Sequence, residues 1–394
     1  MTLGYKIKLD VAFEGYDRQV EWFQPRAAAL PDGRIILTMT KSALWGSDIF
    51  LGIYYSISED MGKNWSEPSL ISNLVMRELH DGYKEAPADI QGMYHNLTGK
   101  VLFTGGTAIY EPGEKGEICC DESHPRYFIY NSFDPKNNEW TEWQRVEMPD
   151  ENQFYWGMAA CCQRYDLDDG EILQPIYGIS RDGIKGNAWT ACYYSTVVKC
   201  RFDGTKLEYV EHGDILSIDV PRGFCEPSLT KFGDYFYLTL RNDIRGYVAR
   251  SEDGLHFEEP IPWRFDDGKE LGSYNTQQHW VTHSEGLFLS YTRKDANNDE
   301  VIRHRAPLFL AQVDTDKMCV IRKTEKAIVP NNGAQLGNFG TANITRNESW
   351  VITSECMQGD AKNPHDLELT EKRGANARVY IARIKWNKPN YLVG

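Results

Sequence analysis

The chain has 394 residues, of which 41% are hydrophobic and 25% charged, the balance of a soluble globular protein. Its net charge of -14 argues against a nucleic acid or an anionic membrane as partner. Nine cysteines, an odd number that includes the adjacent pairs Cys119–Cys120 and Cys161–Cys162, do not form the pattern of a disulfide framework. With no apolar signal core near the start, we expect a reduced, cytoplasmic protein.

Short runs of β-branched and aromatic residues alternate with Gly, Asp, Asn and Pro turns along the whole chain, without long helical periodicity. A loose repeat of about 60 residues divides the chain into units. Each unit opens with a polar segment, then has a turn and an apolar run. The unit starts are residues 26–30, 91–96, 156–159, 226–229, 277–281 and 338–341.

Repeated units of this kind predict an all-β fold, a single β-propeller over residues 1–394 with about six four-stranded blades. Seven blades would result if the segment 111–125 contained further strands. The run over residues 5–13 is expected to complete the last blade beside residues 378–384, which would satisfy an exposed sheet edge. In a propeller the innermost strands begin near the axis, so the polar unit starts should converge there.

Residues 58–65 read Ser-Glu-Asp-Met-Gly-Lys-Asn-Trp, the S-x-D-x-G-x-x-W pattern of an Asp-box turn. The Asp should hydrogen-bond its own turn, the Gly should adopt a positive φ, and the Trp should fill the space between neighbouring sheets. Residues 251–257 are a degenerate second copy that ends in Phe. Such turns resemble those of the sialidase superfamily, and the resemblance implies a sialidase-like propeller.

The same resemblance implies a set of arginines that bind a substrate carboxylate. The segment 24–33 resembles the sialidase Arg-Ile-Pro segment, with Arg26 as the matching arginine although the Ile-Pro is absent. Arg241 resembles the second arginine of the family, and Arg305 resembles the third, with Arg293 and Arg303 as alternatives. Planar guanidinium groups from three blades would hold a carboxylate through paired hydrogen bonds.

The resemblance also implies two acids and reveals one departure. Asp48 occupies the place of the general acid, and Glu226-Pro227 resembles the segment whose Glu assists the nucleophile. Phe339 stands where the family has its nucleophilic Tyr, and Phe cannot attack an anomeric carbon. Tyrosines near other unit starts could substitute: Tyr94, Tyr155 and Tyr274.

Two histidines at unit starts offer another route for proton transfer. His95 and His279 should point toward the axis, and an imidazole can accept or donate a proton near neutral pH. The polar run over residues 275–280, which includes Gln278, has the composition expected for binding sugar hydroxyls, and Tyr94 and Tyr155 are further candidates for substrate binding.

These residues predict an enzyme that cleaves a terminal glycosidic bond at or next to an acidic sugar, with an oligosaccharide as its partner. A β-elimination by His95 or His279, as in rhamnose–glucuronate lyases, is the first alternative, because a lyase needs arginines and a base but no nucleophile. A non-catalytic glycan-binding propeller is the second. No cofactor or catalytic metal is predicted. Structural calcium at residues 166–170 or 295–299 is left open, as is the oligomeric state.

Overall fold

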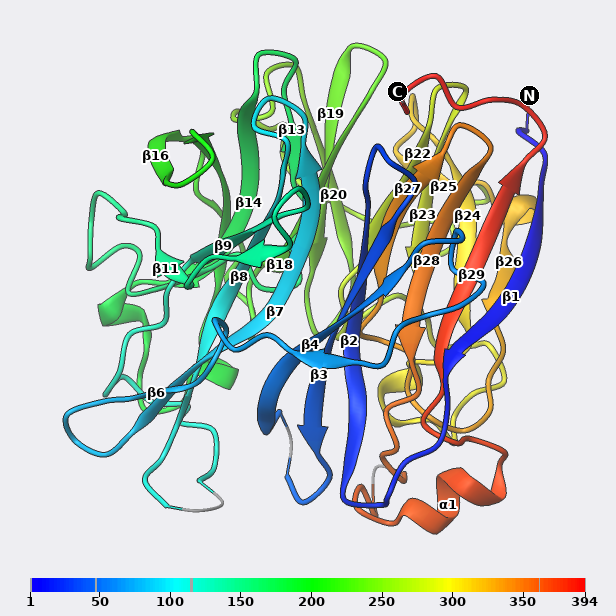
Figure 1. Ribbon diagram of the computed structural model, residues 1–394. Coiled ribbons are helices and arrows are strands. Elements are labelled where there is room, and N and C mark those ends of the chain that lie inside the picture. Colours follow the sequence, from blue (N-terminus) through cyan, green and yellow to red (C-terminus); the bar gives the residue numbers. More distant parts are fainter. Residues whose placement is uncertain (1, 47, 114–115, 361, 394) are drawn as a thin grey trace.

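The computed structural model describes residues 2–46, 48–113, 116–360 and 362–393. Six antiparallel sheets stand around a central axis, which confirms the predicted propeller with six blades rather than seven (Figure 1). The described residues of the segment 111–125 add one isolated bridge between Tyr110 and Ile118 but no blade. The single α-helix among the described residues is α1 (Leu367–Lys372), and none of the described helices is long and apolar enough to cross a membrane.

The first two blades follow one another from the second strand of the chain. Blade 1 contains β2 (Val20–Ala29), β3 (Ile35–Ala43), β4 (Phe50–Ser58) and β5 (Ser69–Leu70). Blade 2 contains β6 (Arg77–Glu78), β7 (Lys84–His95), β8 (Lys100–Tyr110), β9 (Ile129–Asp134), β10 (Glu139–Trp140) and β11 (Gln144–Arg145).

Blades 3 and 4 repeat the up-and-down order. Blade 3 contains β12 (Trp156–Met158), β13 (Tyr165–Asp166), β14 (Glu171–Ile179), β15 (Tyr194–Phe202), β16 (Leu207–His212) and β17 (Leu216–Ser217), with the short helices η1 (Arg181–Gly183) and η2 (Ala188–Thr190). Blade 4 contains β18 (Cys225–Phe232), β19 (Tyr235–Arg241), β20 (Tyr247–Ser251) and β21 (Ile261–Pro262).

The last two blades include the only strand exchange between the two ends of the described chain. Blade 5 contains β22 (His279–His283), β23 (Gly286–Tyr291), β24 (Leu308–Asp314), β25 (Cys319–Val320) and β26 (Lys326–Val329), with the short helices η3 (Ile302–His304) and η4 (Arg322–Thr324). Blade 6 contains β27 (Gly340–Thr345), β28 (Glu348–Ser354), β29 (Val379–Trp386) and, as its outer strand, β1 (Tyr5–Phe13).

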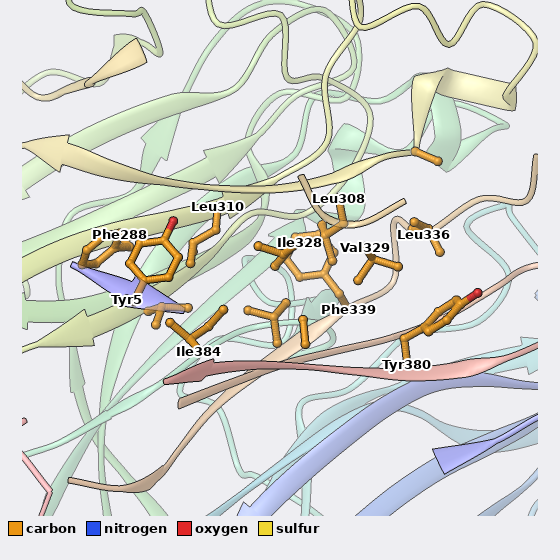
Figure 2. Packing of buried hydrophobic residues seen from close by; sticks show 14 of the residues in the cluster. Tyr5, Phe288, Leu308, Leu310, Ile328, Val329, Leu336, Phe339, Tyr380 and Ile384 are labelled. Carbon is orange, nitrogen blue, oxygen red and sulfur yellow. The ribbon is translucent and has the colours of Figure 1, made fainter. Parts of the chain in front are cut away.

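The N-terminal strand closes the ring as predicted. β1 pairs with β29 in antiparallel register from Tyr5 opposite Trp386 to Phe13 opposite Val379. Tyr5 packs edge-on against Phe288 of blade 5 and against Trp386, with ring centroids 5.6 Å away in each case. Figure 2 shows Tyr5 beside Phe288 and Ile384 in the hydrophobic cluster between blades 5 and 6. The first strand of the chain therefore contributes to both a sheet and a core between blades.

The Asp-box turn after β4 forms the predicted hydrogen bonds. The backbone N–H of Gly62 donates to Ser58 Oγ at 2.7 Å, and the N–H groups of Lys63 and Asn64 donate to Asp60 Oδ1 at 3.0 and 2.9 Å. Ser251 and Asp253 bond the second copy in the same way. The two turns confirm the sequence interpretation.

The first Asp-box also joins blade 1 to blade 6. Trp65 lies against Trp350 of β28, with ring centroids 6.4 Å apart. Arg383 of β29 donates to the carbonyls of Met61 and Gly62, at 2.8 Å each, and pairs with Asp10 of β1 and Glu348 of β28. A buried guanidinium thus holds the turn of one blade onto the neighbouring blade, at the place where the ring closes.

Gly62 provides a test of this contact. A Cβ at Gly62, where φ is +72°, would lie 2.6 Å from Trp350, whereas a Cβ at Gly33, where φ is +89°, would meet no atom within 4 Å. Both Gly→Ala variants should lose about 1 kcal/mol from the positive φ. We expect Gly62→Ala to lose about 1–3 kcal/mol more than Gly33→Ala, because Trp350 must move. Urea unfolding of both variants measures the difference, and equal losses would contradict the proposed role of the turn.

Candidate active site

The starts of the innermost strands lie at one face of the propeller. Long loops gather there, between β8 and β9, β14 and β15, β23 and β24, and β28 and β29. This is the lower face in Figure 1, where α1 lies; the ends of the chain lie at the upper face.

Five residues at this face share an unusual backbone conformation. Gln24, Asp89, Cys161, Glu226 and Asn275 have φ between +45° and +60°, and they come from blades 1 to 5. Gln24, Asp89 and Glu226 lie within β2, β7 and β18; Cys161 lies between β12 and β13, and Asn275 precedes β22. In β2, β7 and β18 the residue lies within a β-bulge. Left-handed backbone outside glycine costs about 1–3 kcal/mol and is typical of functional sites. We call these five residues the left-handed ring.

Arg241 and Arg305 both bind Asn275 of the left-handed ring. Arg241 donates to Asn275 Oδ1 at 3.0 Å and forms ion pairs with Glu226 and with Asp243, the latter at 3.2 Å. Arg305 Nε donates to the backbone carbonyl of Asn275 at 3.0 Å, and its Nη2 donates to the same oxygen. Asn275 therefore holds the guanidinium groups of blades 4 and 5 next to one another.

Arg305 carries a charge that its surroundings do not neutralise. The residue is 6% exposed, and no described carboxylate lies within ion-pair distance of its guanidinium. Burial, followed by the charges of Arg303 and Arg241, lowers the pKa of Arg305 to about 9. An anion placed beside Arg305 would be strongly favoured at such a site.

Two carboxyl groups of the left-handed ring differ in ionisation. Burial raises the pKa of Asp89 to about 7, and its Oδ1 accepts a hydrogen bond from the Cys161 thiol at 3.0 Å. Burial also acts on Glu226, but Arg241 outweighs it and holds the pKa of Glu226 below its usual value. Near neutral pH Glu226 is ionised while much of Asp89 is protonated, which is the arrangement of a proton acceptor beside a proton donor.

Tyr274 and His304 form a second proton-transfer pair. The Tyr274 hydroxyl lies 2.5 Å from His304 Nδ1, and His304 Nε2 lies 3.3 Å from Asp299. Burial raises the pKa of Tyr274, opposed by the charges of Arg305 and Arg303. The pair adjoins the arginines because Tyr274 precedes Asn275 and His304 precedes Arg305.

Three of the predicted residues lie near this site at different depths. Asp48 lies at the rim, where its backbone carbonyl accepts from the Tyr110 hydroxyl at 2.7 Å. Arg26 is 2% exposed, and Nη1 donates to the carbonyls of Pro25 and Asn338 at 3.0 and 3.2 Å. His279 is fully buried, with Nδ1 2.9 Å from Ser228 Oγ.

Two predicted residues lie at the opposite face. His95 ends β7, with its ring nitrogens 2.9 Å from Thr98 Oγ1 and from the Gly170 carbonyl, and Tyr94 precedes it in the same hairpin. β7 begins at Lys84, seven residues before the polar run starting at Gln91, so this run lies at the far end of the strand. The structure does not bring His95 or Tyr94 together with the arginines.

Two further predicted residues, Gln278 and Tyr155, make hydrogen bonds and contacts with other protein groups. Gln278 is 1% exposed; its Oε1 accepts from Thr239 at 2.6 Å and its Nε2 donates to Ser273 at 3.2 Å. The Tyr155 hydroxyl donates to the Glu122 carbonyl at 2.6 Å, and its ring packs under Arg181. Phe339, in the place expected for a nucleophile, is fully buried among Ile328, Val329 and Leu336 (Figure 2).

The two acidic turns at which structural calcium was left open are held by protein contacts. Asp166 pairs with Arg164 at 2.8 Å, and the Asn298 amide donates to the carbonyls of Arg293, His304 and Ala306. Among the described residues, no group of three or more His, Cys, Asp or Glu side chains has the arrangement of a metal site.

The raised pKa values of Asp89 and Glu21 predict how the stability of the fold depends on pH. Burial raises the pKa of each carboxyl to about 7, above the value of about 4 in an unfolded chain. Each therefore binds its proton more tightly when folded, so this stabilisation is complete below about pH 4 and is lost as the pH rises through about 7. We expect the Tm of Asp89→Asn to decrease less than that of the wild type as the pH rises from about 4 to about 7. Adding Glu21→Gln should make this decrease smaller still. A Tm profile identical to that of the wild type would contradict the raised pKa of Asp89.

Comparisons with known proteins identify structures with a similar fold. No protein-family model and no curated protein matches the chain. A protein of unknown function from Dyadobacter fermentans is 13% identical with a TM-score of 0.62, over 97% of this chain and 99% of that chain. The K499G mutant of NanB sialidase from Streptococcus pneumoniae is 10% identical with a TM-score of 0.63, over 95% and 70%. Trypanosoma rangeli sialidase in complex with sialic acid is 10% identical with a TM-score of 0.57, over 97% and 59%.

These similarities establish a sialidase-like β-propeller fold, as the Asp-boxes predicted. The chain spans just under three fifths of the Trypanosoma rangeli sialidase chain. At such identities the likeness concerns the fold, and the chemistry must be argued from the site residues.

Proposed function

We propose that this protein cleaves a glycosidic bond at or next to an acidic sugar, whose carboxylate is held by Arg305 and Arg241. The observation that carries the proposal is the Arg305 guanidinium, which is buried, bonded to the carbonyl of neutral Asn275 and beside a second arginine. A sugar carboxylate would supply the missing negative charge and accept paired hydrogen bonds. The sialic acid bound by the Trypanosoma rangeli sialidase is itself a carboxylate sugar, which supports this substrate class.

In a hydrolysis, Asp89 and Glu226 would take the two proton-transfer roles. Asp89, with a pKa of about 7, can give its proton to the leaving glycosidic oxygen. Glu226, kept ionised by Arg241, can accept a proton from water as the water oxygen attacks the anomeric carbon. Asp48 at the rim is a second candidate donor, as the family resemblance implies. No tyrosine nucleophile is needed for this route, which accommodates the buried Phe339.

The Tyr274–His304 pair favours β-elimination as the second candidate reaction. Beside an arginine-bound uronic carboxylate, the C5 proton becomes acidic and the pair could remove it. The released electrons form the C4–C5 double bond, the C4–O bond breaks, and Asp89 protonates the leaving oxygen. This route resembles the lyase alternative, with Tyr274 and His304 in place of His95 or His279.

Product analysis separates these reactions. Purified protein is incubated with sialylated, glucuronylated and rhamnosyl-glucuronate oligosaccharides, and the products are weighed by mass spectrometry while ultraviolet absorbance is followed. Products that gain one water without a new absorbance indicate hydrolysis. Products that sum to the substrate mass, with the absorbance of an unsaturated uronic acid, indicate elimination. Binding of an acidic oligosaccharide in calorimetry without any product would support the glycan-binding alternative and refute the enzyme proposal.

A further inference from the structure

A serine, a histidine and an aspartate form a chain of hydrogen bonds in blade 2. Ser123 Oγ lies 2.9 Å from His124 Nδ1, and His124 Nε2 lies 2.7 Å from Asp81 Oδ2. Asp81 comes from the loop between β6 and β7, and the other two residues come from the loop between β8 and β9. The start of β7 pairs with the end of β8, so both loops lie at the face of the left-handed ring. We call these three residues the blade 2 triad.

Contacts with blade 3 and with Tyr83 hold His124 in place. Nε1 of Trp156 donates to the backbone carbonyl of His124 at 2.9 Å. The Tyr83 ring lies against the imidazole, with ring centroids 4.1 Å apart and 33° between the two planes. The side chain of His124 is 13% exposed, whereas Ser123 is an exposed residue. The imidazole is therefore fixed between protein groups, while Ser123 is open to a ligand from solvent.

The carboxylate of Asp81 determines the tautomer of the neutral imidazole. The hydrogen bond from His124 lowers the pKa of Asp81, so this carboxyl is ionised near neutral pH. An ionised carboxylate only accepts hydrogen bonds, so Nε2 of His124 carries the proton and donates it to Asp81. Nδ1 then has a free lone pair that faces Ser123 Oγ. A serine nucleophile is activated by this arrangement, in which a carboxylate orients the histidine that takes the serine proton.

A second aspartate, Asp121, holds the loop and competes for the hydroxyl proton of Ser123. Its Oδ1 accepts from the backbone N–H of Ser123 at 2.9 Å and from the Cys119 thiol at 3.3 Å, and hydrogen bonding with Ser123 lowers the pKa of Asp121. Sγ of Cys119, 3.4 Å from the Ser123 hydroxyl, is only a weak acceptor. If the hydroxyl donated to Asp121, lone pairs on Ser123 Oγ and His124 Nδ1 would face each other over 2.9 Å. Donation to His124 removes that repulsion, so the neutral imidazole is the acceptor.

The backbone next to Ser123 offers a donor for the negative charge that a serine nucleophile creates on a carbonyl oxygen. The N–H of His124, the residue after the nucleophile, makes no hydrogen bond with another described residue. A backbone N–H at this position forms part of the oxyanion hole in α/β-hydrolases. The N–H of His124 is therefore available to an ester bound at Ser123.

We propose that the blade 2 triad hydrolyses small carboxylic esters, such as an O-acyl group on a sugar. Ser123 Oγ bonds to the carbonyl carbon while its proton passes to Nδ1 of His124, and Asp81 positions the ring. The ester C–O bond then breaks, and the leaving alcohol takes that proton. Water gives a proton to Nδ1 as its oxygen attacks the acyl carbon, a carboxylic acid leaves, and Ser123 regains its proton. This activity is independent of the reaction at Arg305.

Covalent labelling of the full wild-type chain with an alkyl fluorophosphonate tests the nucleophile without a mutation. Ser123 Oγ should bond to phosphorus and release fluoride, and mass spectrometry should find one phosphonyl group on Ser123 within the tryptic peptide 116–126. Ser123→Ala should lose this label and lower kcat/KM for 4-nitrophenyl acetate by at least about 100-fold. Its Tm should not change, because Ser123 is exposed.

Two aspartates of the same region provide a matched pair of variants. Asp81→Asn should lower kcat for 4-nitrophenyl acetate by about 10- to 100-fold with KM unchanged, because Asp81 acts only through His124. Asp121→Asn should keep kcat within about threefold, because the amide oxygen of asparagine can accept the same backbone N–H of Ser123. A wild-type chain without a label on Ser123, or equal losses of kcat in the two variants, would overturn the proposal.

Discussion

Arg305→Met should lower kcat/KM for the acidic substrate by about 10²- to 10³-fold while leaving the Tm unchanged or raising it. Loss of one charged partner from a buried pair costs about 2–5 kcal/mol of binding, which converts to a rate loss of this size. The stability of the substrate-free protein should not fall, because a buried guanidinium without a carboxylate partner is replaced by an apolar side chain of similar length. Activity and stability should therefore change in opposite directions.

Arg293→Met is the matched control, because Arg293 lies on the loop that follows β23 in the same blade. Its Nε and Nη2 donate to Glu325 at 2.9 and 2.8 Å, so its charge is already neutralised. The variant should lower the Tm, since Glu325 loses its partner, and leave kcat/KM within about twofold. If Arg305→Met kept full activity, the assignment of the carboxylate site would be wrong.

Deletion of residues 2–13 should unfold the protein or reduce its stability by most of its total. β1 contributes the buried Tyr5 and the partly buried Ile7 and Leu9 to the cluster between blades 5 and 6. Loss of that apolar burial, at about 1.5–3 kcal/mol for each large side chain, approaches the 5–15 kcal/mol by which a typical protein is stable. Arg383 would lose its pair with Asp10, and β29 would become an open sheet edge. Circular dichroism and size-exclusion chromatography should show lost cooperativity and self-association.

A synthetic peptide of residues 2–13 should restore the deletion variant, because β1 is joined to the rest of blade 6 only through one edge of β29. Lys8→Ala serves as the control for a surface change on the same strand. Lys8 is mostly exposed and pairs with Asp10, so its loss should cost less than about 0.5 kcal/mol. A deletion variant with the wild-type Tm would show that the ring closes without its outer strand.

The fold was largely predictable because it repeats. The Asp-box pattern fixes a turn through Ser, Asp and Gly, and each of these makes the expected bond. Over residues 5–9 buried or half-buried side chains alternate with exposed ones, as suits an outer strand beside residues 378–384. Such features depend on local chemistry and periodicity, which a single sequence contains.

The site was predictable only where the family resemblance supplied residues. Glu226, Arg241 and Arg305 do meet, and Asp48 lies at the rim. Asp89 was missed because its importance arises from a bulge in β7 and a contact with Cys161, 72 residues away along the chain. His95 was expected at the wrong end of β7, because a polar run indicates one end of an inner strand and does not show which end it is. His304 was missed because it follows no strand-start pattern and depends on the positive φ of Arg303 and of itself.

Ring closure by β1 has a consequence for synthesis. β1 leaves the ribosome before the other described strands and pairs with β29, which is made after all of them. The first five blades can form while translation proceeds, but blade 6 and the core that it shares with blade 5 must wait until β29 has been made. During that time β1 is an unpaired segment that exposes side chains, such as Tyr5, which are buried in the folded protein. Its escape from wrong partners depends on how fast blade 6 is completed, so slow translation of residues 340–386 would increase misfolding.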